Sequence, residues 1–393
     1  MMAAACREAG LNLPVLDAVG ERIGLDETLS KIRSHQPPVV VVYCSWGTLE
    51  SDCEAIGAIR RAFRTLPIIA VGAGIRFSCE ELLLAGATHV LLGDPDLALA
   101  RFLTLASPRP GIHRVRDLMP EAHNHAGLLR DPSLLPRPAW DTVPWQHYGF
   151  LTLFGARGCD DTCRYCAYIT VQGRAYRPRP AQDVIDEMLW LARTYRPRRI
   201  MVRDPVFAHD RSRAMAIARG LAAVRFDTPW ECESRPEHFD AALLRQMAKA
   251  GCTVIKLGIE TADAELLVRL GRIANPAEAR HYLAYTARVI ADARRYGIIT
   301  RAFVMVGLPG QTTESVEATA AYLRRVRPAY VHARPYVAYP RVPLGPAQTS
   351  DRTQALLPPL QAVADECQVR STRPPSLQQR VRRRLTRLWL TYT

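Results

Sequence analysis

Lysine is scarce in this chain, and long apolar runs are absent from it. Only three of its 52 basic residues are lysines (Lys31, Lys249 and Lys256), so the formal net charge of +14 rests on arginine. This bias is typical of a GC-rich genome, and it weakens the inference of a nucleic-acid-binding surface from charge alone. No stretch approaches the ~18 apolar residues of a membrane-spanning helix. Arg7 and Glu8 interrupt the first residues before the apolar core of a signal peptide can form. We therefore expect a cytoplasmic protein with no membrane span.

Cysteine is too scarce and too unevenly placed for a secreted disulfide framework. Three of the ten cysteines lie within eight residues of one another, which favours a reducing compartment. At the usual ~150 residues per domain, the 393 residues allow two or three domains with substantial cores.

Residues 1–106 are predicted to form a doubly wound, Rossmann-like α/β domain. Strands rich in Val, Ile and Leu are expected at 13–17, 38–45, 67–73 and 89–94, with helices at 25–35, 48–64 and 78–86. Such strands joined by helices indicate a parallel sheet covered on both faces. Ligands of these sheets bind at the carboxyl ends of the strands. The residues that fall at these ends are Ser45, Gly47, Gly72, Gly74, Gly93 and Asp94.

The composition changes twice after this domain. Residues 107–147 carry seven prolines and no sustained hydrophobic period, which predicts a linker. In residues 148–344 strands are again expected to alternate with helices, at 150–155, 198–204, 229–235, 253–260, 299–307 and 330–338. This pattern suits a partial (β/α)6 TIM-like barrel, whose reactive groups belong at the carboxyl ends of its strands. Residues 345–393 are predicted to be a short helical region with a basic tail.

A cysteine motif follows the first strand of the predicted barrel. The segment GARGCDDTCRYCAY places Cys159, Cys163 and Cys166 in a C-x3-C-x2-C array. Sulfur ligands select iron-sulfur clusters, zinc or copper(I). Structural zinc sites close with four protein ligands, and no nearby Cys or His supplies a fourth. A 4Fe-4S cluster with one open iron is therefore the favoured interpretation, and chance clustering or a degenerate zinc knuckle is the alternative.

This motif and its position resemble the radical S-adenosylmethionine (SAM) superfamily, over about residues 150–340. The resemblance implies that the open iron binds the amino and carboxylate groups of SAM. One electron, delivered by a donor such as flavodoxin or ferredoxin, then cleaves SAM to methionine and a 5′-deoxyadenosyl radical. That radical abstracts hydrogen from a small-molecule substrate. The resemblance marks no residue that directs the radical.

The resemblance also implies contacts with SAM. Tyr165 occupies the position that packs near adenine, with plain core packing as the alternative. Asp204 stands where simpler members have Gly-Gly-Glu. A charged pair at the end of a buried strand is costly unless it is paired or binds something, so Glu233 and Arg235 either contact SAM or substrate, or form a mutual salt bridge. The remaining implied contacts are Gly258, Glu260, Gly307 and Pro309, the last two in a turn that is equally an ordinary strand–helix connection.

The first domain resembles the cobalamin-binding domain of the cobalamin-dependent branch of this superfamily. The similar segments are VLDA (15–18), PVVVVYCS (38–45), AVGAGIRFSCEEL (70–82), LLGDPD (91–96), LPRPAWDTVP in the linker and AYPRVPL (338–344). The resemblance implies a corrin on the carboxyl edge of the sheet, near Ser45, Gly72, Gly74 and Gly93. The chain has no Asp-x-His-x-x-Gly segment, so no histidine ligand to cobalt is expected. The strand that precedes the first helix in this branch is missing, so either the recorded start is internal or the domain no longer binds cobalamin.

The leading hypothesis is cobalamin-dependent methylation of an unactivated carbon in a natural-product or lipid intermediate. A second keeps the cofactors but performs cyclisation, rearrangement or oxidation. Methylthiolation of transfer RNA is disfavoured, because Cys44, Cys53 and Cys79 lack the spacing of an auxiliary cluster. An iron-sulfur nucleic-acid-binding protein is the alternative from another class. Its support is the tail at 380–390, although a terminal helix docked on the barrel explains that tail better, so a nucleic-acid partner is not expected. In this tail Val381, Leu385 and Leu388 share one helical face.

Overall fold

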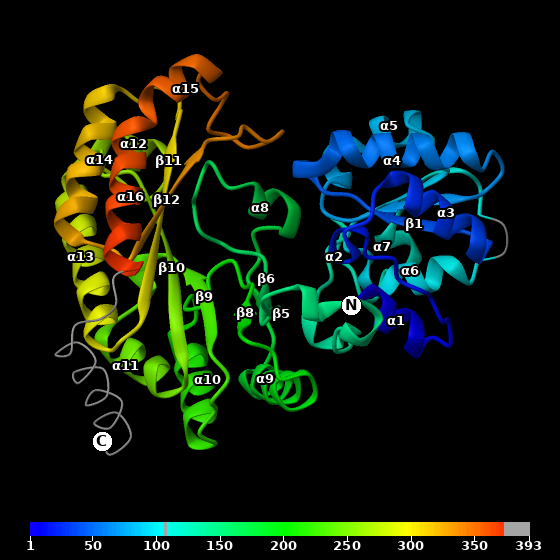
Figure 1. Cartoon of the computed structure of the whole chain (residues 1–393), viewed down its shortest axis with the longest axis horizontal. Coiled ribbons are helices and arrows are strands. Elements are labelled where there is room, and N and C mark those ends of the chain that lie inside the picture. The colour runs from blue at the N-terminus through cyan, green and yellow to red at the C-terminus, as the bar shows by residue number, and fades with distance from the viewer. Residues whose placement is uncertain (106–107, 373–393) are drawn as a thin grey trace. The chain divides into compact units, whose positions relative to one another are not determined.

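The computed structural model describes residues 1–105 and 108–372, which form an α/β fold with parallel sheets. The chain divides into two compact units. Unit 1 comprises residues 1–149 and 171–173, and unit 2 comprises the other described residues from 150 onward. Figure 1 labels the elements of both units. The basic tail at 380–390 lies outside the described residues.

Unit 1 is built on a four-stranded parallel sheet with the order β1-β2-β3-β4. Its strands are β1 (Val40–Tyr43), β2 (Ile68–Val71), β3 (His89–Leu92) and β4 (Gly111–Arg114). Its helices are α1 (Met2–Glu8), α2 (Ala18–Glu21), α3 (Leu25–His35), α4 (Leu49–Ala62), α5 (Ile75–Leu84), α6 (Pro95–Leu103) and α7 (Val115–Leu118). The strands predicted at 38–45, 67–73 and 89–94 are confirmed.

The two faces of this sheet are covered by different helices. Ile68 and Ala70 of β2 pack in a cluster with side chains of α3, α4 and α5. Ile69 and Val71 pack on the other side, with side chains of α1 and α6. This alternation follows from the two-residue period of a strand, so β2 is buried on both faces.

The strand predicted at 13–17 is wrong, because no strand occurs there. Asp17 instead begins α2, where its carboxylate accepts a hydrogen bond from the backbone N–H of Gly20 at 2.9 Å. The Tyr148 hydroxyl donates to the same carboxylate at 2.7 Å. This end of the segment is therefore held by a helix cap and a tyrosine and not by a sheet neighbour. Its apolar side chains Val15 and Leu16 remain exposed.

The segment 107–147, predicted as a linker, contains part of the sheet of unit 1. β4 pairs with β3, with Gly111 beside His89. Val115 then enters the apolar cluster under the sheet, and Leu129 is buried farther along. The prolines interrupt helices, but backbone hydrogen bonds in turns, such as Asp94 N–H to Gly127 C=O at 2.8 Å, hold the segment in place.

Unit 2 is built on a six-stranded parallel sheet with the order β12-β11-β10-β9-β8-β5. Its strands are β5 (Leu151–Leu153), β8 (Ile200–Val202), β9 (Trp230–Ser234), β10 (Cys252–Glu260), β11 (Ile299–Val306) and β12 (Tyr330–Pro335). All six strands predicted from the sequence are confirmed. β6 (Ala156–Arg157) and β7 (Arg177–Pro178) form a small antiparallel pair.

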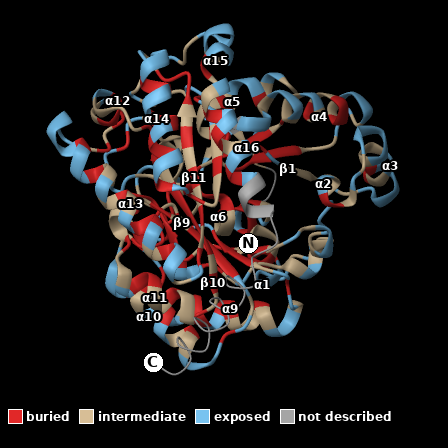
Figure 2. Cartoon of the chain, turned by 60° about the vertical axis from the view of Figure 1, so that its left-hand side comes forward, coloured by how far each residue is buried: buried red, intermediate tan, exposed pale blue. Residues whose placement is uncertain are grey.

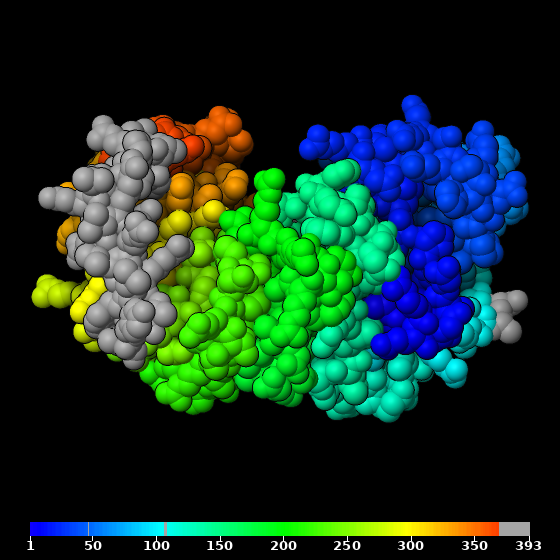
Figure 3. Space-filling view, turned by 60° about the horizontal axis from the view of Figure 1, so that its bottom comes forward, coloured from blue at the N-terminus to red at the C-terminus, as the bar shows by residue number. Residues whose placement is uncertain are grey.

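Helices lie between successive strands of this sheet, as in repeated strand–helix units, and two further helices follow its last strand, β12. They are α8 (Ala167–Gln172), α9 (Ala181–Tyr195), α10 (Arg211–Ala223), α11 (Ala241–Lys249), α12 (Ala264–Arg269), α13 (Ala279–Arg295), α14 (Thr313–Val326), α15 (Ser350–Leu356) and α16 (Pro358–Thr372). Figure 3 brings the bottom of Figure 1 forward, and the green part of the chain, which includes α9, α10 and α11, faces the viewer there. Within the described residues, no helix is both long and apolar enough to cross a membrane.

The two faces of the large sheet differ in chemistry. Ile255 and Leu257 of β10 are fully buried, and the strands labelled β9 and β10 lie among the parts of the chain coloured as buried in Figure 2. The alternate residues Lys256 and Gly258 lie beside Arg301 and Phe303 of β11. One face is therefore an apolar core, and the other carries charged and aromatic side chains toward the carboxyl ends of the strands.

Candidate functional site

The three motif cysteines lie on the loop between β6 and α8, beyond the carboxyl end of β5. Cys159 and Cys163 are buried and Cys166 is half-buried. Cys159 and Cys166 pack with Ile169 and Val206 in one apolar cluster. The loop therefore gathers the thiols in a partly dry environment at the carboxyl end of the sheet.

The loop is pressed against the turn that follows α12. Arg164 N–H donates to the Leu270 carbonyl at 2.9 Å, and the Thr162 hydroxyl donates to the Gly271 carbonyl at 2.9 Å. Gly271 has φ +71°, and a Cβ there would lie 2.3 Å from the Thr162 carbonyl oxygen. Only glycine fits this contact without strain, so the turn is shaped to receive the cysteine loop.

Charged side chains surround Cys163 in particular. Nη1 of Arg235 lies 3.7 Å and Nη1 of Arg272 lies 3.8 Å from its sulfur. Arg235 also pairs with Asp161 at 3.0 Å and with Glu237 at 2.5 Å. Asp161 and Glu237 partly neutralise the positive charge of Arg235. N–H groups of both arginines point at the Cys163 sulfur.

Burial changes the proton affinity of the other two thiols. It raises the pKa of Cys159 to about 12 and the pKa of Cys166 to about 11, because a thiolate loses its hydration there. Cys163 raises the pKa of both thiols further, so the three sulfur atoms lie within electrostatic reach of one another. Without a metal these two thiols stay protonated at neutral pH, and a bound cation would release their protons.

Glu260 ends β10 in an unusual conformation. Its φ is +67°, and the register with β11 shifts between Gly258 and Glu260. Its carboxylate accepts a hydrogen bond from the Tyr165 hydroxyl at 2.9 Å. A Cβ on Gly258 would lie 2.3 Å from Oε1 of Glu260. Glycine is therefore needed at 258 because the carboxylate of Glu260 folds back over it.

Arg272 joins these residues to the cysteine loop. It is 5% exposed, and it donates to the Gly258 carbonyl at 2.5 Å and to the Tyr165 hydroxyl at 3.5 Å. Burial raises the pKa of Glu260, and the charge of Arg272 opposes that rise. Arg272 is not among the site residues that the sequence motifs predict. An arginine two residues after Leu270, the C-cap of α12, matches no motif in the sequence. Its proximity to Cys163 is visible only in the folded chain.

Asp204 lies beneath the cysteine loop and is completely buried. Its Oδ1 accepts hydrogen bonds from the N–H groups of Gly155 at 2.5 Å and Ala156 at 2.9 Å. Arg213 lies 3.5 Å from Oδ2. Burial raises the pKa of Asp204 to about 6, and Arg213 opposes that rise. In this arrangement Asp204 positions the chain that leads into the cysteine loop.

Glu233 and Arg235 do not form the mutual salt bridge considered from the sequence. Glu233 pairs with Arg203 at 3.7 Å, whereas Arg235 pairs with Asp161 and Glu237. The reason is local geometry: β9 ends at Ser234, and Arg235 is the N-cap residue of a short 3-10 helix that begins at Pro236. The strand period that would align the two side chains therefore stops between them.

The turn of Gly307 and Pro309 is braced by the chain around it. Gly307 has φ +80° and donates its N–H to Oε1 of Gln311 at 2.7 Å. A Cβ there would lie 2.4 Å from the Thr353 hydroxyl of α15. Pro309 is half-buried. The packing against α15 thus explains this glycine without a contact between the turn and SAM.

Comparison with protein-family models matches residues 154–323 to the radical SAM superfamily. The chain carries a radical SAM domain. The matched span includes the three cysteines as well as Glu260 and Gly307. A radical SAM domain implies a 4Fe-4S cluster and SAM as cofactors.

Two of the relatives of the chain are methyltransferases by name. It is 24% identical over 218 residues to an uncharacterised methyltransferase from Pyrococcus horikoshii, a match that covers 54% of this chain and 46% of the relative. It is 29% identical over 234 residues to cytidylyl-2-hydroxyethylphosphonate methyltransferase from Streptomyces wedmorensis, covering 54% of this chain and 42% of the relative. The chain thus spans less than half the length of these curated relatives.

Solved structures show the same fold over both units. The radical SAM methyltransferase TsrM from Kitasatospora setae, with cobalamin and a 4Fe-4S cluster bound, has a TM-score of 0.68 at 19% identity and covers 85% of this chain and 71% of its own. The cobalamin-dependent radical enzyme OxsB, with aqua-cobalamin and SAM bound, has a TM-score of 0.62 at 14% identity and covers 93% of this chain and 53% of its own. At these identities the likeness shows the fold alone.

The donor set of the radical SAM domain fits a cluster held by three thiolates. Cys159, Cys163 and Cys166 converge on one loop. Among the other described cysteines, Cys232 of β9 and Cys252 of β10 are buried, and the Cys252 thiol donates to the Val254 carbonyl at 3.6 Å. Three sulfur ligands suit three irons of a cubane and leave the fourth iron open to SAM.

The candidate cobalamin residues of unit 1 meet at one edge of its sheet, after β1, β2 and β3. Ser45 N–H donates to Asp52 at 2.9 Å, and the N–H of Gly74 donates to the Cys44 carbonyl at 3.1 Å. A Cβ on Gly72 or on Gly93 would lie 2.5 Å from a carbonyl oxygen of the same unit. These two glycines are therefore already required by the packing of unit 1.

One further group near the radical SAM loop has metal-binding residue types. The ligand atoms of Asp161, His209 and His238 lie within 4.8 Å of one another. The guanidinium of Arg235 lies 3.0 Å from Asp161, and Asp160 lies 3.0 Å from His209. A cation would have to displace Arg235 from Asp161, so these residues fit an ion poorly.

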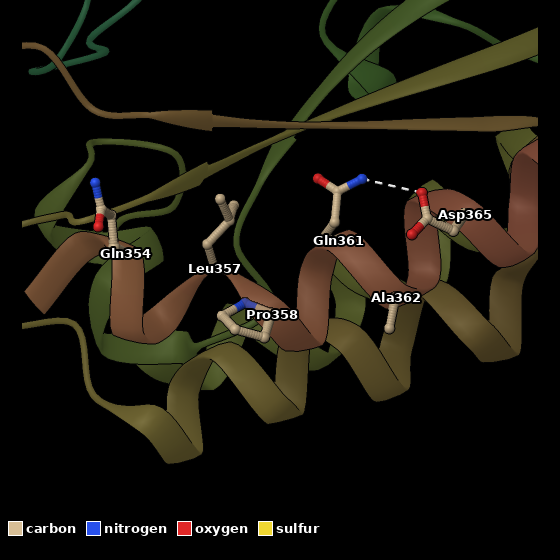
Figure 4. A pocket seen from close by; sticks show the side chains of 6 residues that line it. All are labelled: Gln354, Leu357, Pro358, Gln361, Ala362 and Asp365. Carbon is tan, nitrogen blue, oxygen red and sulfur yellow. Dashed lines mark hydrogen bonds between the residues drawn. The ribbon is translucent and has the colours of Figure 1, made fainter. Parts of the chain in front are cut away.

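A separate open cavity of about 400 Å3 lies along α15 and α16 (Figure 4). Its acid, Asp365, accepts a hydrogen bond from Gln361 at 3.0 Å. None of the candidate site residues lines it. The lining residues are Gln354, Leu357, Pro358, Gln361, Ala362 and Asp365.

Proposed function

We propose that the protein is a cobalamin-dependent radical SAM methyltransferase that acts on an unactivated carbon of a small natural-product or lipid intermediate. The observation that carries the proposal is the likeness of both units together to TsrM, over 85% of this chain. On this reading, unit 1 is a Rossmann-like cobalamin-binding domain that lacks its first strand. Unit 2 is a partial (β/α)6 barrel followed by a helical C-terminal region. The methyltransferase names of the relatives support the same reaction.

The assignment of side chains follows the geometry of the site. Cys159, Cys163 and Cys166 hold the cluster. When bound, the cluster supplies the electron that cleaves SAM, and cobalamin supplies the methyl group. Tyr165 lies in the cysteine loop and Glu260 lies beside it, where a hydroxyl and a carboxylate can hold the base and hydroxyls of SAM. Gly258 keeps the strand bare beneath them.

Other candidate residues have supporting roles in this proposal. Asp204 holds the backbone before the loop, and Glu233 lies at the end of β9 where the polar face of the sheet meets the site. Arg235 positions the loop through Asp161. Gly307 and Pro309 shape the turn that borders SAM. Ser45, Gly72, Gly74 and Gly93 would border cobalamin through the backbone of unit 1, and an electron donor such as flavodoxin or ferredoxin would reduce the cluster.

The cluster assignment is tested with anaerobically reconstituted protein. Wild type should cleave SAM to 5′-deoxyadenosine in the presence of a reductant, and Cys163→Ala should lose this activity by more than a hundredfold, because a cluster held by two thiolates is not retained. Cys53→Ala, which removes a half-buried thiol outside the motif, is the control and should cleave SAM like wild type. Equal cleavage by Cys163→Ala and wild type would show that the assignment is wrong.

Cobalamin binding is tested separately. Protein purified anaerobically from cobalamin-supplied cells should show a corrin absorption spectrum with about one corrin per chain. A cluster without a corrin would leave radical SAM chemistry but remove the methyl-transfer mechanism.

A second candidate function keeps the radical SAM chemistry without methyl transfer. It is favoured by a similarity of 26% over 212 residues to the anaerobic magnesium-protoporphyrin IX monomethyl ester cyclase of Rubrivivax gelatinosus, which covers 52% of this chain. On this reading the protein performs a cyclisation, rearrangement or oxidation. Isotope-labelled methyl SAM distinguishes the two, because only a methyltransferase moves the label into product.

A further inference from the structure

Two arginines from distant parts of unit 2 converge on one of the three cysteines. Nη1 of Arg235 lies 3.7 Å and Nη1 of Arg272 lies 3.8 Å from Sγ of Cys163, within the range of an N–H···S hydrogen bond. Arg235 follows β9, and Arg272 follows α12. The sulfur is thus approached by two cationic donors at once.

Both guanidinium groups are fixed in place by contacts of their own. Arg272 donates to the Gly258 carbonyl at 2.5 Å and to the Tyr282 hydroxyl at 2.9 Å. Arg235 is held by Asp161 at 3.0 Å and donates to the Arg272 carbonyl at 3.2 Å. Rigid placement matters here, because a mobile cation on the surface would be screened by water and salt.

The other two thiols receive different donors. The backbone N–H groups of Tyr168 and Ile169 act on Cys166, and that of Asp161 acts on Cys159. The Cys159 thiol also lies 3.4 Å from the carboxylate of Asp161. The guanidinium groups of Arg235 and Arg272 therefore act on Cys163, whereas backbone N–H groups act on Cys159 and Cys166.

A positive charge beside a ligand sulfur changes the energy of adding an electron. Reduction makes the cluster and its thiolates more negative by one charge. A buried guanidinium therefore stabilises the reduced cluster more than the oxidised cluster. Hydrogen bonds to ligand sulfurs act in the same direction. We propose that Arg235 and Arg272 are positioning residues that set the reduction potential of the cluster by donating to Cys163, with Glu237 as the acid that moderates them.

This inference rests on the cluster part of the proposed function and goes beyond it, because it concerns the ease of reduction. Glu237 lies 2.5 Å from Arg235 and 3.8 Å from Arg272, so it weakens the field of both arginines. Removal of an arginine and removal of this acid should therefore move the potential in opposite directions.

The test is the midpoint potential of the reconstituted cluster, measured by redox titration with electron paramagnetic resonance at fixed pH. Arg272→Gln and Arg235→Gln should each shift the reduction equilibrium at least tenfold toward the oxidised form, which is about 59 mV for one electron. Glu237→Gln should shift it toward the reduced form. Arg272→Lys keeps the charge but not the forked donor, and should fall between wild type and Arg272→Gln.

Arg211→Gln is the matched control. It removes one arginine from unit 2 whose exposed side chain pairs with Asp240. The equilibrium constant for reduction of its cluster should stay within twofold of the wild-type value. If Arg272→Gln loses the cluster, Arg235→Gln and Glu237→Gln still test the inference through the same sulfur.

The outcomes separate this inference from the proposed function. Wild type that holds no iron and sulfide overturns both. A cluster without corrin removes cobalamin alone and leaves the potentials measurable. This inference is overturned, while SAM cleavage stands, if the reduction equilibrium constants of Arg235→Gln and Arg272→Gln stay within twofold of wild type. A Glu237→Gln shift of the same sign as theirs would also overturn it.

Discussion

Glu260 shows how one residue can carry backbone strain at the candidate site. A non-glycine residue at φ +67° is strained, and such strain persists only when surrounding contacts hold it. Here the holding contacts are the Tyr165 hydroxyl on its carboxylate and the bare Cα of Gly258 beneath it. The three residues therefore depend on one another.

Gly258→Ala should break this arrangement. Its new Cβ would lie 2.3 Å from Oε1 of Glu260, so the carboxylate must leave Tyr165. We expect a loss of about 1–3 kcal/mol in the free energy of unfolding, as for overpacking in a core, measured by urea denaturation. Gly149→Ala, where a Cβ meets nothing within 4 Å, should change it by less than about 0.5 kcal/mol.

A double-mutant cycle checks the cause. In a Glu260→Ala background the clash is gone, so Gly258→Ala should cost little. An equal cost in both backgrounds would contradict the assignment of the clash to Glu260.

At the scale of elements, β5 and β8 are linked by a buried acid that holds the chain entering the cysteine loop. Asp204 follows β8, and its Oδ1 accepts from Gly155 and Ala156, which follow β5. Its pKa is raised to about 6 by burial. Because the folded state disfavours the charged form, Asp204 contributes stability below the pKa of the unfolded chain, and that contribution is lost as pH rises toward 6.

Asp204→Asn should remove this pH dependence. From pH 4 to above pH 6, the free energy of unfolding of wild type should fall relative to that of the variant by up to about 3 kcal/mol, from the size of the pKa shift. Urea denaturation of both proteins across this range is the measurement. A parallel pH dependence of the two proteins would show that Asp204 does not titrate with folding.

At the scale of the whole molecule, each unit has its own sheet and its own apolar clusters. Ile69 and Val71 are buried in the sheet of unit 1, and Ala302 and Val304 are buried in that of unit 2. Units with separate cores can unfold separately. Two transitions are therefore expected in calorimetry.

Core substitutions should assign these transitions. Val71→Ala should lower the temperature of one transition, and Val304→Ala should lower the other, since each buried methyl group removed costs about 1 kcal/mol. Added cobalamin should raise only the transition that Val71→Ala lowers. A single transition shifted by both variants would contradict separate unfolding.

The sequence by itself determined the features that depend on neighbours along the chain. The spacing of Cys159, Cys163 and Cys166 predicts a cluster site on their loop, and the apolar runs of unit 2 predicted all six strands of its sheet, because ligand spacing and strand burial are local patterns. The local pattern gave a wrong prediction at 13–17, where the apolar run has no neighbouring strand and its last residue, Asp17, caps α2. It also failed at 107–147, where β4 pairs with β3.

Only the tertiary structure decided which side chains meet. Arg272 lies 109 residues from Cys163, and its role exists only because the turn after α12 packs on the cysteine loop. Glu233 and Arg235 take different partners because β9 ends between them. Gly258 is required by Glu260 and not by any pattern of its own. Contacts of this kind depend on how strands align and where turns fold back, and no periodicity in the sequence encodes them.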